Sequence, residues 1–414
     1  MGSNRTVVGL DVGTTKTCVV VGQEYRDTQL HVLGIGTAPS LGLKGGQVVD
    51  IVQTVKAIDD AVMQAEEAAS TRVRGVVAGI AGGHLQSHSQ QAEVRLAANQ
   101  TVRPRHMNDV VRSAATMSLP AEREIAAVIP KTFNVDHLTD VLDPRGLTGR
   151  CLQVEAHVVT GATNAMTNLD RCVLGAGCEV RDRVLQPLAS AASCLTADQR
   201  HEGAAVVDIG GGTTDLAIYV GDACWHIAVI PMGGVLVTSD IARGLRLPNR
   251  VAEALKIQHG RIDPWVDSDE STVEVPGFDH GSPVAVRRRD LARVISARME
   301  EILMLVRDEI VRSGYYDVLP AGIVMTGGGS LTPGLAAMGS ELLDLPVSLG
   351  RPCALWGLDD DMRGPEFSTA IGLTMMGAGP RPDEGWLEHR PLRRSGVLST
   401  VGGWVRNMVS PAPA

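Results

Sequence analysis

Residues 206–219 read Val206-Val207-Asp208-Ile209-Gly210-Gly211-Gly212-Thr213-Thr214-Asp215-Leu216-Ala217-Ile218-Tyr219: an apolar segment, an aspartate, a glycine turn and a second apolar segment. Residues 7–21 repeat this plan as Val7-Val8-Gly9-Leu10-Asp11-Val12-Gly13-Thr14-Thr15-Lys16-Thr17-Cys18-Val19-Val20-Val21. Both patterns predict a β-hairpin. Glycine turns allow backbone N–H groups to converge on phosphate oxygens, and a neighbouring aspartate can hold hydrated Mg²⁺. A single turn of this kind is also compatible with an ordinary hairpin, but two of them predict two half-molecules that clamp one nucleotide.

A third glycine-rich pattern follows near the C-terminal end of the chain. Residues 322–334 read Gly322-Ile323-Val324-Met325-Thr326-Gly327-Gly328-Gly329-Ser330-Leu331-Thr332-Pro333-Gly334. This pattern predicts a buried strand, a glycine turn and a helix that begins with Thr332 as N-cap and Pro333 as its first residue. Glycines have no Cβ and leave room for a ribose and a base beside the backbone. In this order, the three patterns resemble the phosphate-1, phosphate-2 and adenosine signatures of the actin/Hsp70/sugar-kinase superfamily.

The composition limits the class of protein. A chain of 414 residues with 44% hydrophobic content can bury more than one core, so roughly two to four subdomains are expected. The net charge of −9 argues against general nucleic-acid binding. Seven cysteines without a CxxC pair indicate free thiols in a reducing cytoplasm, and we expect Cys172 and Cys178 to be buried as small apolar groups. The sequence has no run of eighteen apolar residues, so we expect no membrane-spanning helix.

The middle of the first half differs in character from its surroundings. Residues 84–160 contain alternating patterns that predict strands at Ser87–Leu96, Glu124–Val135 and Cys151–Thr160, and a helix at Pro104–Met117. These elements are sufficient for a small α/β insert with its own sheet.

The chain changes again at its C-terminal end. The segment Gly377–Pro391 is rich in proline and glycine and is predicted to be a linker. Beyond it, apolar residues recur with helical spacing, and arginines are the only charges after Glu388. The apolar positions are Val397, Leu398, Val401, Trp404, Val405 and Met408, and Arg394 and Arg406 contribute to the basic character.

A terminal basic amphipathic helix with a tryptophan on its apolar face is suited to an anionic membrane surface. The alternative is a helix that docks on its own domain or on a partner. Gly402 and Gly403 each weaken the helix by up to ~1 kcal/mol relative to Ala, so we expect it to fold on the lipid. Because one short helix is a marginal anchor, stable attachment should need several copies, and we expect polymerisation and membrane binding to be coupled.

Further stretches resemble the FtsA family of bacterial actin-like cell-division proteins. They are Glu124–Lys131 and Gly146–Gly149 in the insert, Val251–Lys256 after the second phosphate turn, and residues 395–408. The resemblance covers the chain from Val7 to Met408. It implies an α/β, actin-like (ribonuclease H-like) two-lobed fold with an FtsA-type inserted subdomain, and it implies ATP and Mg²⁺ as cofactors.

The resemblance also implies a division of the chain. Subdomain 1A comprises residues 1–83, 161–198 and 349–379; the inserted subdomain 1C comprises 84–160; subdomain 2A comprises 199–238 and 313–348; and subdomain 2B comprises 239–312. Residues 380–394 are the linker and 395–410 the membrane-targeting helix.

The signatures assign the ligand-binding residues. Asp11 and Asp208 each open a phosphate turn, and we expect them to face Mg²⁺ through water. Backbone and hydroxyl groups should hydrogen-bond to the phosphates from Gly13, Thr14, Thr15, Gly210, Gly211, Gly212 and Thr213. The adenosine should pack on Gly327, Gly328 and Gly329.

Other assignments leave two interpretations open. Lys16 either neutralises phosphate charge or faces solvent beside the loop. Glu253 and Lys256, one helical turn apart, either reach the ribose and base or form an exposed ion pair. Asp215 either orders a water or caps its hairpin, and Gln186 precedes a helix where relatives place a residue near the hydrolytic water. These last two are the candidate catalytic residues, and whether ATP is hydrolysed is left open.

The implied function is an ATP-binding scaffold that polymerises at the cytoplasmic face of the membrane at the division site. Its implied partners are the FtsZ C-terminal tail, copies of itself, anionic lipids and later division proteins, without nucleic acid. Subdomain 2B should receive the acidic FtsZ tail, with arginines as candidate contacts: Arg243, Arg246, Arg250, Arg287, Arg288 and Arg289. A solvated basic face is the alternative there. A sugar or small-molecule kinase and an Hsp70-like ATPase are the rival functions on the same fold.

Overall fold

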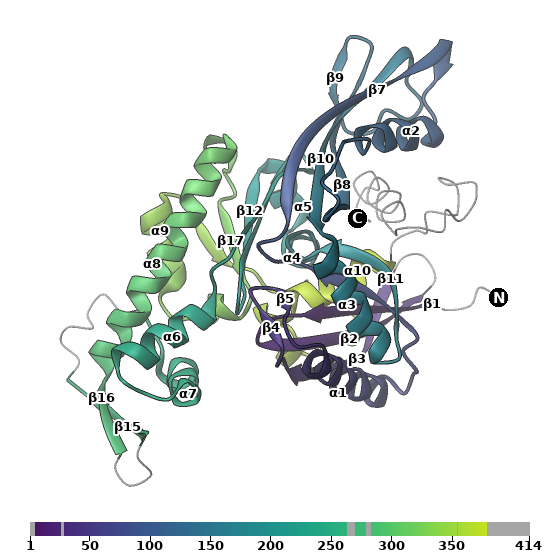
Figure 1. Ribbon diagram of the computed structural model, residues 1–414. Helices are drawn as coiled ribbons and strands as arrows, with labels where there is room; N and C mark the ends of the chain where they lie inside the picture. The colour runs from purple at the N-terminus through teal and green to yellow at the C-terminus, as the bar shows by residue number, and fades with distance from the viewer. Residues whose placement is uncertain (1–4, 26–28, 263–269, 279–282, 354, 379–414) are drawn as a thin grey trace.

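The computed structural model of the chain describes residues 5–25, 29–262, 270–278, 283–353 and 355–378. It contains two five-stranded sheets that share one topology (Figure 1). In each sheet, three consecutive strands form an antiparallel meander. A later strand pairs in parallel with the first strand of the meander, and a second later strand pairs in parallel with that one. The two related halves predicted from the repeated turns are therefore present, and we call them the first and second lobes.

The first lobe is built on the sheet β11-β6-β1-β2-β3. Its strands are β1 (Arg5–Val12), β2 (Lys16–Tyr25), β3 (Gln29–Pro39), β6 (Gly75–Ile80) and β11 (Glu179–Leu185), with a small hairpin of β4 (Leu43–Lys44) and β5 (Gln47–Val48). Its helices are α1 (Ile51–Ala69), α3 (Thr163–Gly175), α4 (Gln186–Cys194) and α10 (Ser368–Ala378). Buried side chains of α1 and α3 pack on one face of the sheet, and those of α4 and α10 pack on the other.

The second lobe is built on the sheet β14-β13-β12-β17-β18. Its strands are β12 (Ala204–Ile209), β13 (Thr214–Val220), β14 (Ala223–Ile230), β17 (Ile323–Thr326) and β18 (Val347–Leu349), with a separate hairpin of β15 (Thr272–Pro276) and β16 (Pro283–Arg287). Its helices are α5 (Ala197–Glu202), α6 (Gly234–Gly244), α7 (Asn249–His259), α8 (Arg288–Ser313) and α9 (Leu335–Leu343). Short 3₁₀ helices lie at Tyr316–Val318, Gly328–Leu331, Asp360–Met362 and Pro365–Phe367.

The predicted insert forms a sheet of its own and projects from the first lobe as an arm (Figure 1). The strand order is β7-β10-β8-β9, with all neighbours antiparallel. The elements are β7 (Gln86–Thr101), α2 (Pro104–Ala114), β8 (Arg123–Val135), β9 (Leu138–Val141) and β10 (Thr148–Ala162). Helix α2 packs on this sheet through Met107, Val110 and Val111, all fully buried. The insert therefore has a hydrophobic core separate from those of the two lobes.

Helix α4 lies between the two sheets. Val184 of β11 and Ala189 of α4 belong to the core of the first lobe, whereas Leu188 and Ala191 pack in a cluster with Val206 and Ala217 of the second lobe. The alternating strand residues Val207 and Leu216 instead face the helices of the second lobe. Each sheet is thus covered on both faces, and the second sheet shares one of its faces with the first lobe.

The hairpin predictions are confirmed, and one helix prediction is wrong. Strands β1 and β2 pair with Asp11 opposite Cys18, and β12 and β13 pair with Asp208 opposite Asp215. The third glycine pattern does not lead into a helix at Pro333, because Gly328–Leu331 form a 3₁₀ turn and α9 begins two residues after Pro333 with Gly334 as N-cap. The Thr332 hydroxyl donates back to the Gly329 carbonyl instead. A local capping signal was overridden by the turn that precedes it.

Several other expectations have clear outcomes. Cys172 and Cys178 are buried free thiols, as predicted. Helix α8 ends at Gly314, which adopts the left-handed conformation with φ 79°. None of the helices in the described part of the chain combines the length and the apolar character needed to cross a bilayer. The predicted linker and terminal helix lie outside the described residues, and the division into subdomains stays a prediction.

Close packing of α10 on α4 yields a first testable prediction. A Cβ added at Gly372 of α10 would overlap the carbonyl oxygen of Ala189 in α4. Gly372→Ala should therefore lower the free energy of unfolding by about 1–3 kcal/mol, because two helix backbones must move apart. Gly244→Ala is the matched helical control, since its Cβ would lie 3.6 Å from Val294. Urea unfolding should show the control unchanged or stabilised; equal effects in both variants would contradict this account of the packing.

Candidate functional site

A cavity of about 430 Å³ lies between the two lobes. Every residue assigned to ligand binding from the sequence lines it, although these residues come from distant segments. They are Asp11, Gly13, Thr14, Thr15, Lys16, Gln186, Asp208, Gly210, Gly211, Gly212, Thr213, Asp215, Glu253, Lys256, Gly327, Gly328 and Gly329. A volume of this order is typical of small-molecule and cofactor sites.

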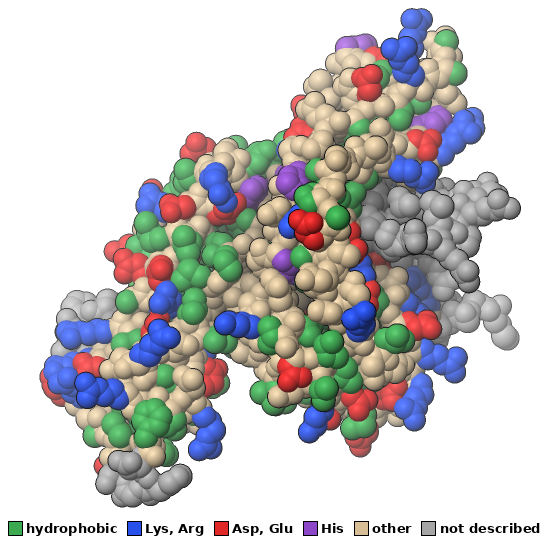
Figure 2. Space-filling model, viewed as in Figure 1, with side chains coloured by type: hydrophobic (Ala, Val, Ile, Leu, Met, Phe, Trp, Pro, Cys, Tyr) green, Lys and Arg blue, Asp and Glu red, His purple; other side chains and the backbone are tan. Residues whose placement is uncertain are grey.

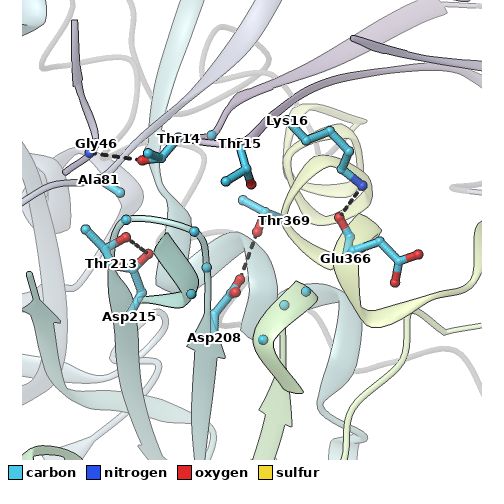
Figure 3. Close-up of a pocket in the computed structure, with 18 of the residues that line it drawn as sticks. Thr14, Thr15, Lys16, Gly46, Ala81, Asp208, Thr213, Asp215, Glu366 and Thr369 are labelled. Carbon is cyan, nitrogen blue, oxygen red and sulfur yellow. Dashed lines mark hydrogen bonds between the residues drawn. The ribbon is translucent and has the colours of Figure 1, made fainter. Parts of the chain in front are cut away.

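The two phosphate turns face each other across this cavity (Figure 3). Each turn is closed by the same backbone hydrogen bond, from Gly13 N to Lys16 O (3.0 Å) and from Gly210 N to Thr213 O (2.9 Å). A Cβ at Gly212 would overlap the hydroxyl of Thr14, which itself accepts from Gly46 N at 3.3 Å. Only glycine permits this approach of the two lobes, so the turn sequence and the lobe arrangement depend on each other.

The third glycine turn, which begins at Gly327, packs against the end of the strand that leads into the second turn. Gly327 has φ 80°, and a Cβ at this position would overlap the Asp208 carboxylate. Its N–H donates to the carbonyl of Pro365 at 3.2 Å. The adenosine-type turn therefore starts directly beside the end of β12, and the three turns border one continuous space.

Three carboxylates lie at the point where the lobes meet: Asp208 and Asp215 are buried, and Asp11 is half-buried. Asp208 accepts hydrogen bonds from the hydroxyls of Ser190 (2.6 Å) and Thr369 (2.9 Å). Asp11 accepts from the side-chain amide of Gln186 at 2.8 Å. Burial raises the pKa of Asp208, although the two hydroxyls oppose this rise. Burial, with the nearby Asp208 charge, raises the pKa of Asp11 to about 7.

Asp215 provides the most direct indication of a cation site. It is 4% exposed, and its Oδ1 atom has no hydrogen-bond partner in the described part of the chain. Burial and the Asp208 charge raise its pKa well above the usual value. Carboxylates grouped in this way fit a hard divalent cation with its water shell, which would offset both the desolvation and the mutual repulsion. Among the described residues, no three acidic, histidine or cysteine side chains form a direct metal-ligand cluster, so these carboxylates would hold Mg²⁺ through its water shell.

Lys16 is half-buried at the edge of the cavity, and its role toward phosphate stays a prediction. Its ammonium donates to the carbonyl of Glu366 at 2.9 Å and lies 3.8 Å from the ring centroid of Phe367. Figure 3 shows the side chain turned toward Glu366 and away from Thr14 and Asp215. Lys16 lines the cavity, yet its charge is shared with the segment that leads into α10.

The pair on α7 is not simply an exposed ion pair. Lys256 Nζ lies 2.8 Å from Glu253 and also donates to Thr238 Oγ1 (2.9 Å) and Gly234 O (3.1 Å). The Lys256 side chain is 19% exposed. These bonds anchor the pair to the N-terminal turn of α6 at the wall of the cavity, where its polar atoms can reach a ligand.

Several residues of the site were not found from the sequence. Ser190 and Thr369 hold Asp208 from α4 and α10, and Gly46 contacts Thr14 from the small β4–β5 hairpin. Glu366 lines the same cavity beside Lys16. None of these residues lies in a recognisable motif, and the only available signal was the presence of hydroxyl side chains in α4 and α10, two short helices without charged residues.

The buried carboxylates make the stability of the ligand-free protein depend on pH. The pKa of Asp11 is 3.8 in the unfolded chain and about 7 in the folded protein. Between these two pH values the folded state binds more protons than the unfolded state. The free energy of unfolding therefore falls as the pH rises. Asp11→Asn should remove part of this slope, at most about 1.4 kcal/mol per pH unit. Urea unfolding in EDTA between pH 4 and 7 measures it. The control Asp59→Asn, on the exposed side of α1, should keep the wild-type slope; parallel curves for wild type and Asp11→Asn would contradict the prediction.

Comparisons with known proteins agree with this geometry. Solved structures similar in fold include a PilM–PilN type IV pilus biogenesis complex (TM-score 0.66, 20% identity, covering 90% of this chain and 99% of that chain). Another is MreB5 of Spiroplasma citri bound to ADP (TM-score 0.53, 13% identity, 90% and 96% covered). At these identities the likeness concerns the fold, and it confirms the actin-like architecture.

Sequence comparisons identify the family as well as the fold. The family model described as cell division protein FtsA matches residues 205–372, and that of the SHS2 domain inserted in FtsA matches 82–160. The FtsA of Pseudomonas aeruginosa is 40% identical over 92% of this chain and 91% of its own length. The FtsA of Escherichia coli K12 is 34% identical over 98% and 97%. The chain therefore belongs to the FtsA family of actin-like cell-division proteins.

Proposed function

We propose that this protein binds ATP with Mg²⁺ in the cleft and acts as an actin-like scaffold of the division machinery at the cytoplasmic face of the membrane. In this role it polymerises, anchors the FtsZ ring through its C-terminal amphipathic helix and recruits later division proteins. Membership of the FtsA family supports a role in cell division. It also disfavours the two rival functions, a sugar kinase and an Hsp70-like ATPase. Robust phosphate transfer to a panel of sugars would overturn the proposal.

The observation that carries the nucleotide assignment is the meeting of two aspartate–glycine turns across one cavity. Backbone N–H groups of both turns border the space that a β- and γ-phosphate would fill, and the carboxylates beside them suit Mg²⁺. The third turn and the Glu253–Lys256 pair lie where ribose and base would extend. Because the phosphate contacts come from both lobes, nucleotide binding would hold the lobes together and act as a conformational switch.

Lys256 offers a specific test of nucleotide binding. Lys256→Gln should weaken ATP binding about tenfold, since loss of one charge-assisted contact costs about 1.4 kcal/mol. The matched control is Lys56→Gln, an exposed lysine on α1 outside the cavity. Titration with a fluorescent ATP analogue, with Mg²⁺ and with EDTA, measures the change. Equal affinities of the two variants for the ATP analogue would show that Lys256 does not contribute to nucleotide binding. Absence of binding by the wild-type protein would overturn the nucleotide assignment.

The far end of the second lobe supports an acidic peptide as partner. Figure 2 shows basic side chains gathered over the region of β15 and β16. Arg287 pairs with Asp290 at 2.7 Å, Arg289 pairs with Glu270, and Arg288 contacts His259. Arg243, Arg246 and Arg250 are exposed on or beside α6 and α7. An acidic FtsZ tail would compete with the internal partners of Arg287, Arg288 and Arg289. It would contact the exposed Arg243, Arg246 and Arg250 directly.

The terminal segment carries the membrane part of the proposal. Full-length protein with ATP should sediment with anionic vesicles, whereas protein lacking residues 395–414 should remain in solution. Trp404→Ala should lower the bound fraction about tenfold, because it removes the largest apolar side chain of the predicted helix. Ser399→Ala, on the opposite side of that helix, is the matched control and should bind as wild type.

The same assay tests the coupling to polymerisation. Because a single copy of the helix is a marginal anchor, a variant that cannot assemble should dissociate from the vesicles at low protein concentration. Complete sedimentation of such monomers would show that one helix is sufficient and that coupling is absent.

A further inference from the structure

The insert is joined to the first lobe and also rests on the second. Ala127 and Ile129 of β8 and Val159 of β10 belong to a buried cluster that contains Tyr219 and Ile227 of the second lobe. Figure 1 shows the base of the arm beside the second sheet, from which its tip projects away. The arm therefore bridges the two lobes outside the cleft.

The joint with the first lobe is covalent and rich in polar contacts. The chain crosses into and out of the insert at the start of β7 and the end of β10. Within the insert, Arg123 of β8 joins the two ends of the segment by donating to the carbonyls of His84 (3.1 Å) and Thr160 (2.9 Å). Arg183 of β11 pairs with Glu124 of β8 at 3.2 Å. This ion pair and the two chain crossings fix the base of the arm to the first lobe.

The contact with the second lobe is different, because its polar interactions converge on one residue, Trp225. His157 Nε2 and the carbonyl oxygen of Trp225 are 2.6 Å apart, which places the imidazole as the donor. The ammonium of Lys131 lies 4.9 Å from the centroid of the Trp225 ring. Lys131 and His157 are each only 6% exposed, so this contact covers both side chains.

The charges around Trp225 are paired within their own bodies. In the insert, Lys131 pairs with Glu155 at 2.5 Å. In the second lobe, His226 lies 2.8 Å from Glu309, which also pairs with Arg312. Opening this contact would break one hydrogen bond, one cation–π contact and some apolar packing, and it would leave no charge without its partner. Because these ion pairs stay within one body each, opening the contact separates no pair of opposite charges and costs only the hydrogen bond, the cation–π contact and the apolar packing.

The start of the insert borders the cleft. His84 lines the cavity and is the residue at which the insert begins. Next to it, a Cβ at Gly83 would lie 3.4 Å from Pro231, directly after β14, the strand that carries Trp225. A change in the position of the lobes around the cavity would therefore also act on the contact between β14 and the arm.

We propose that the insert is a latched arm, hinged on the first lobe and held on the second lobe by Trp225, and that nucleotide in the cleft tightens the latch. The inference rests on the proposed nucleotide binding and adds a structural consequence of it, a change in how firmly the insert is held on the second lobe. With the latch closed, the arm moves with the second lobe; with the latch open, it moves independently of it. The surface of the insert is thereby held in one orientation for a larger fraction of the time when the cleft is occupied.

Lysine acetylation of the full chain, read by mass spectrometry, tests this inference. The lysines of the chain are Lys16, Lys44, Lys56, Lys131 and Lys256. Lys131 reports the latch, Lys256 at the cavity wall reports nucleotide, and exposed Lys56 provides the reference rate. ATP with Mg²⁺ should slow Lys131 labelling about threefold relative to Lys56, as expected if cleft closure suppresses local opening.

Two variants open the latch from opposite sides. Trp225→Ala should raise the Lys131 rate about tenfold, as expected from the loss of a cation–π contact and packing, and should abolish the ATP effect. His157→Ala removes the crossing hydrogen bond without altering the second lobe, so it remains informative if Trp225→Ala fails to fold. The matched control Trp356→Ala changes an exposed tryptophan of the chain outside this contact.

The outcomes separate the inference from the proposed function. If ATP protects Lys256 while the Lys131 rate is unchanged by ATP and by both latch variants, the latch is overturned. If ATP leaves Lys256 unprotected, the nucleotide assignment fails instead, and the two variants still test the latch itself. A Lys131 rate raised equally by Trp356→Ala would show general destabilisation and would also overturn the latch.

Discussion

Burial of carboxylates where two glycine turns touch is the constraint on which the rest of this structure depends. Asp208 is held by hydroxyls from two helices of the first lobe, although it lies on a strand of the second. The lobes are therefore joined through their most strongly desolvated charges, and the pKa values of Asp11, Asp208 and Asp215 are all raised. Such an arrangement is stable when hydroxyl donors or a cation compensate the charge, and it links the stability of the fold to the occupancy of the cleft.

The duplicated sheet topology explains why this point exists at all. Each meander delivers an aspartate and a glycine turn at the end of its first strand, and α4 lies between the two sheets so that both turns point into one space. The third turn is added by the parallel strand β17, which pairs with β12 in register so that Asp208 lies opposite Thr326. The geometry of the site is thus a consequence of strand order, with the glycines permitting the close approach.

The insert shows how a family-specific element is fitted to a general fold. It has a core of its own, a polar joint with the first lobe and a contact with the second lobe that is centred on Trp225. Ion pairs on each side of that contact are internal to one body. An insert whose ion pairs stay on its own side of the contact can change its position relative to the second lobe, as we propose for this arm.

The sequence by itself determined the two hairpins, the inserted subdomain, the family and those cavity residues that lie in the three glycine-rich turns, because glycine turns and alternating strands are local patterns. Tertiary structure alone decided that Lys16 turns to the Glu366 carbonyl, that Ser190 and Thr369 hold Asp208, and that Thr332 does not begin a helix. The physical reason is the range of the interactions. Those contacts join residues far apart in the chain or follow from the conformation of a preceding turn, and hydrogen bonds and packing of that kind leave no periodicity in the sequence.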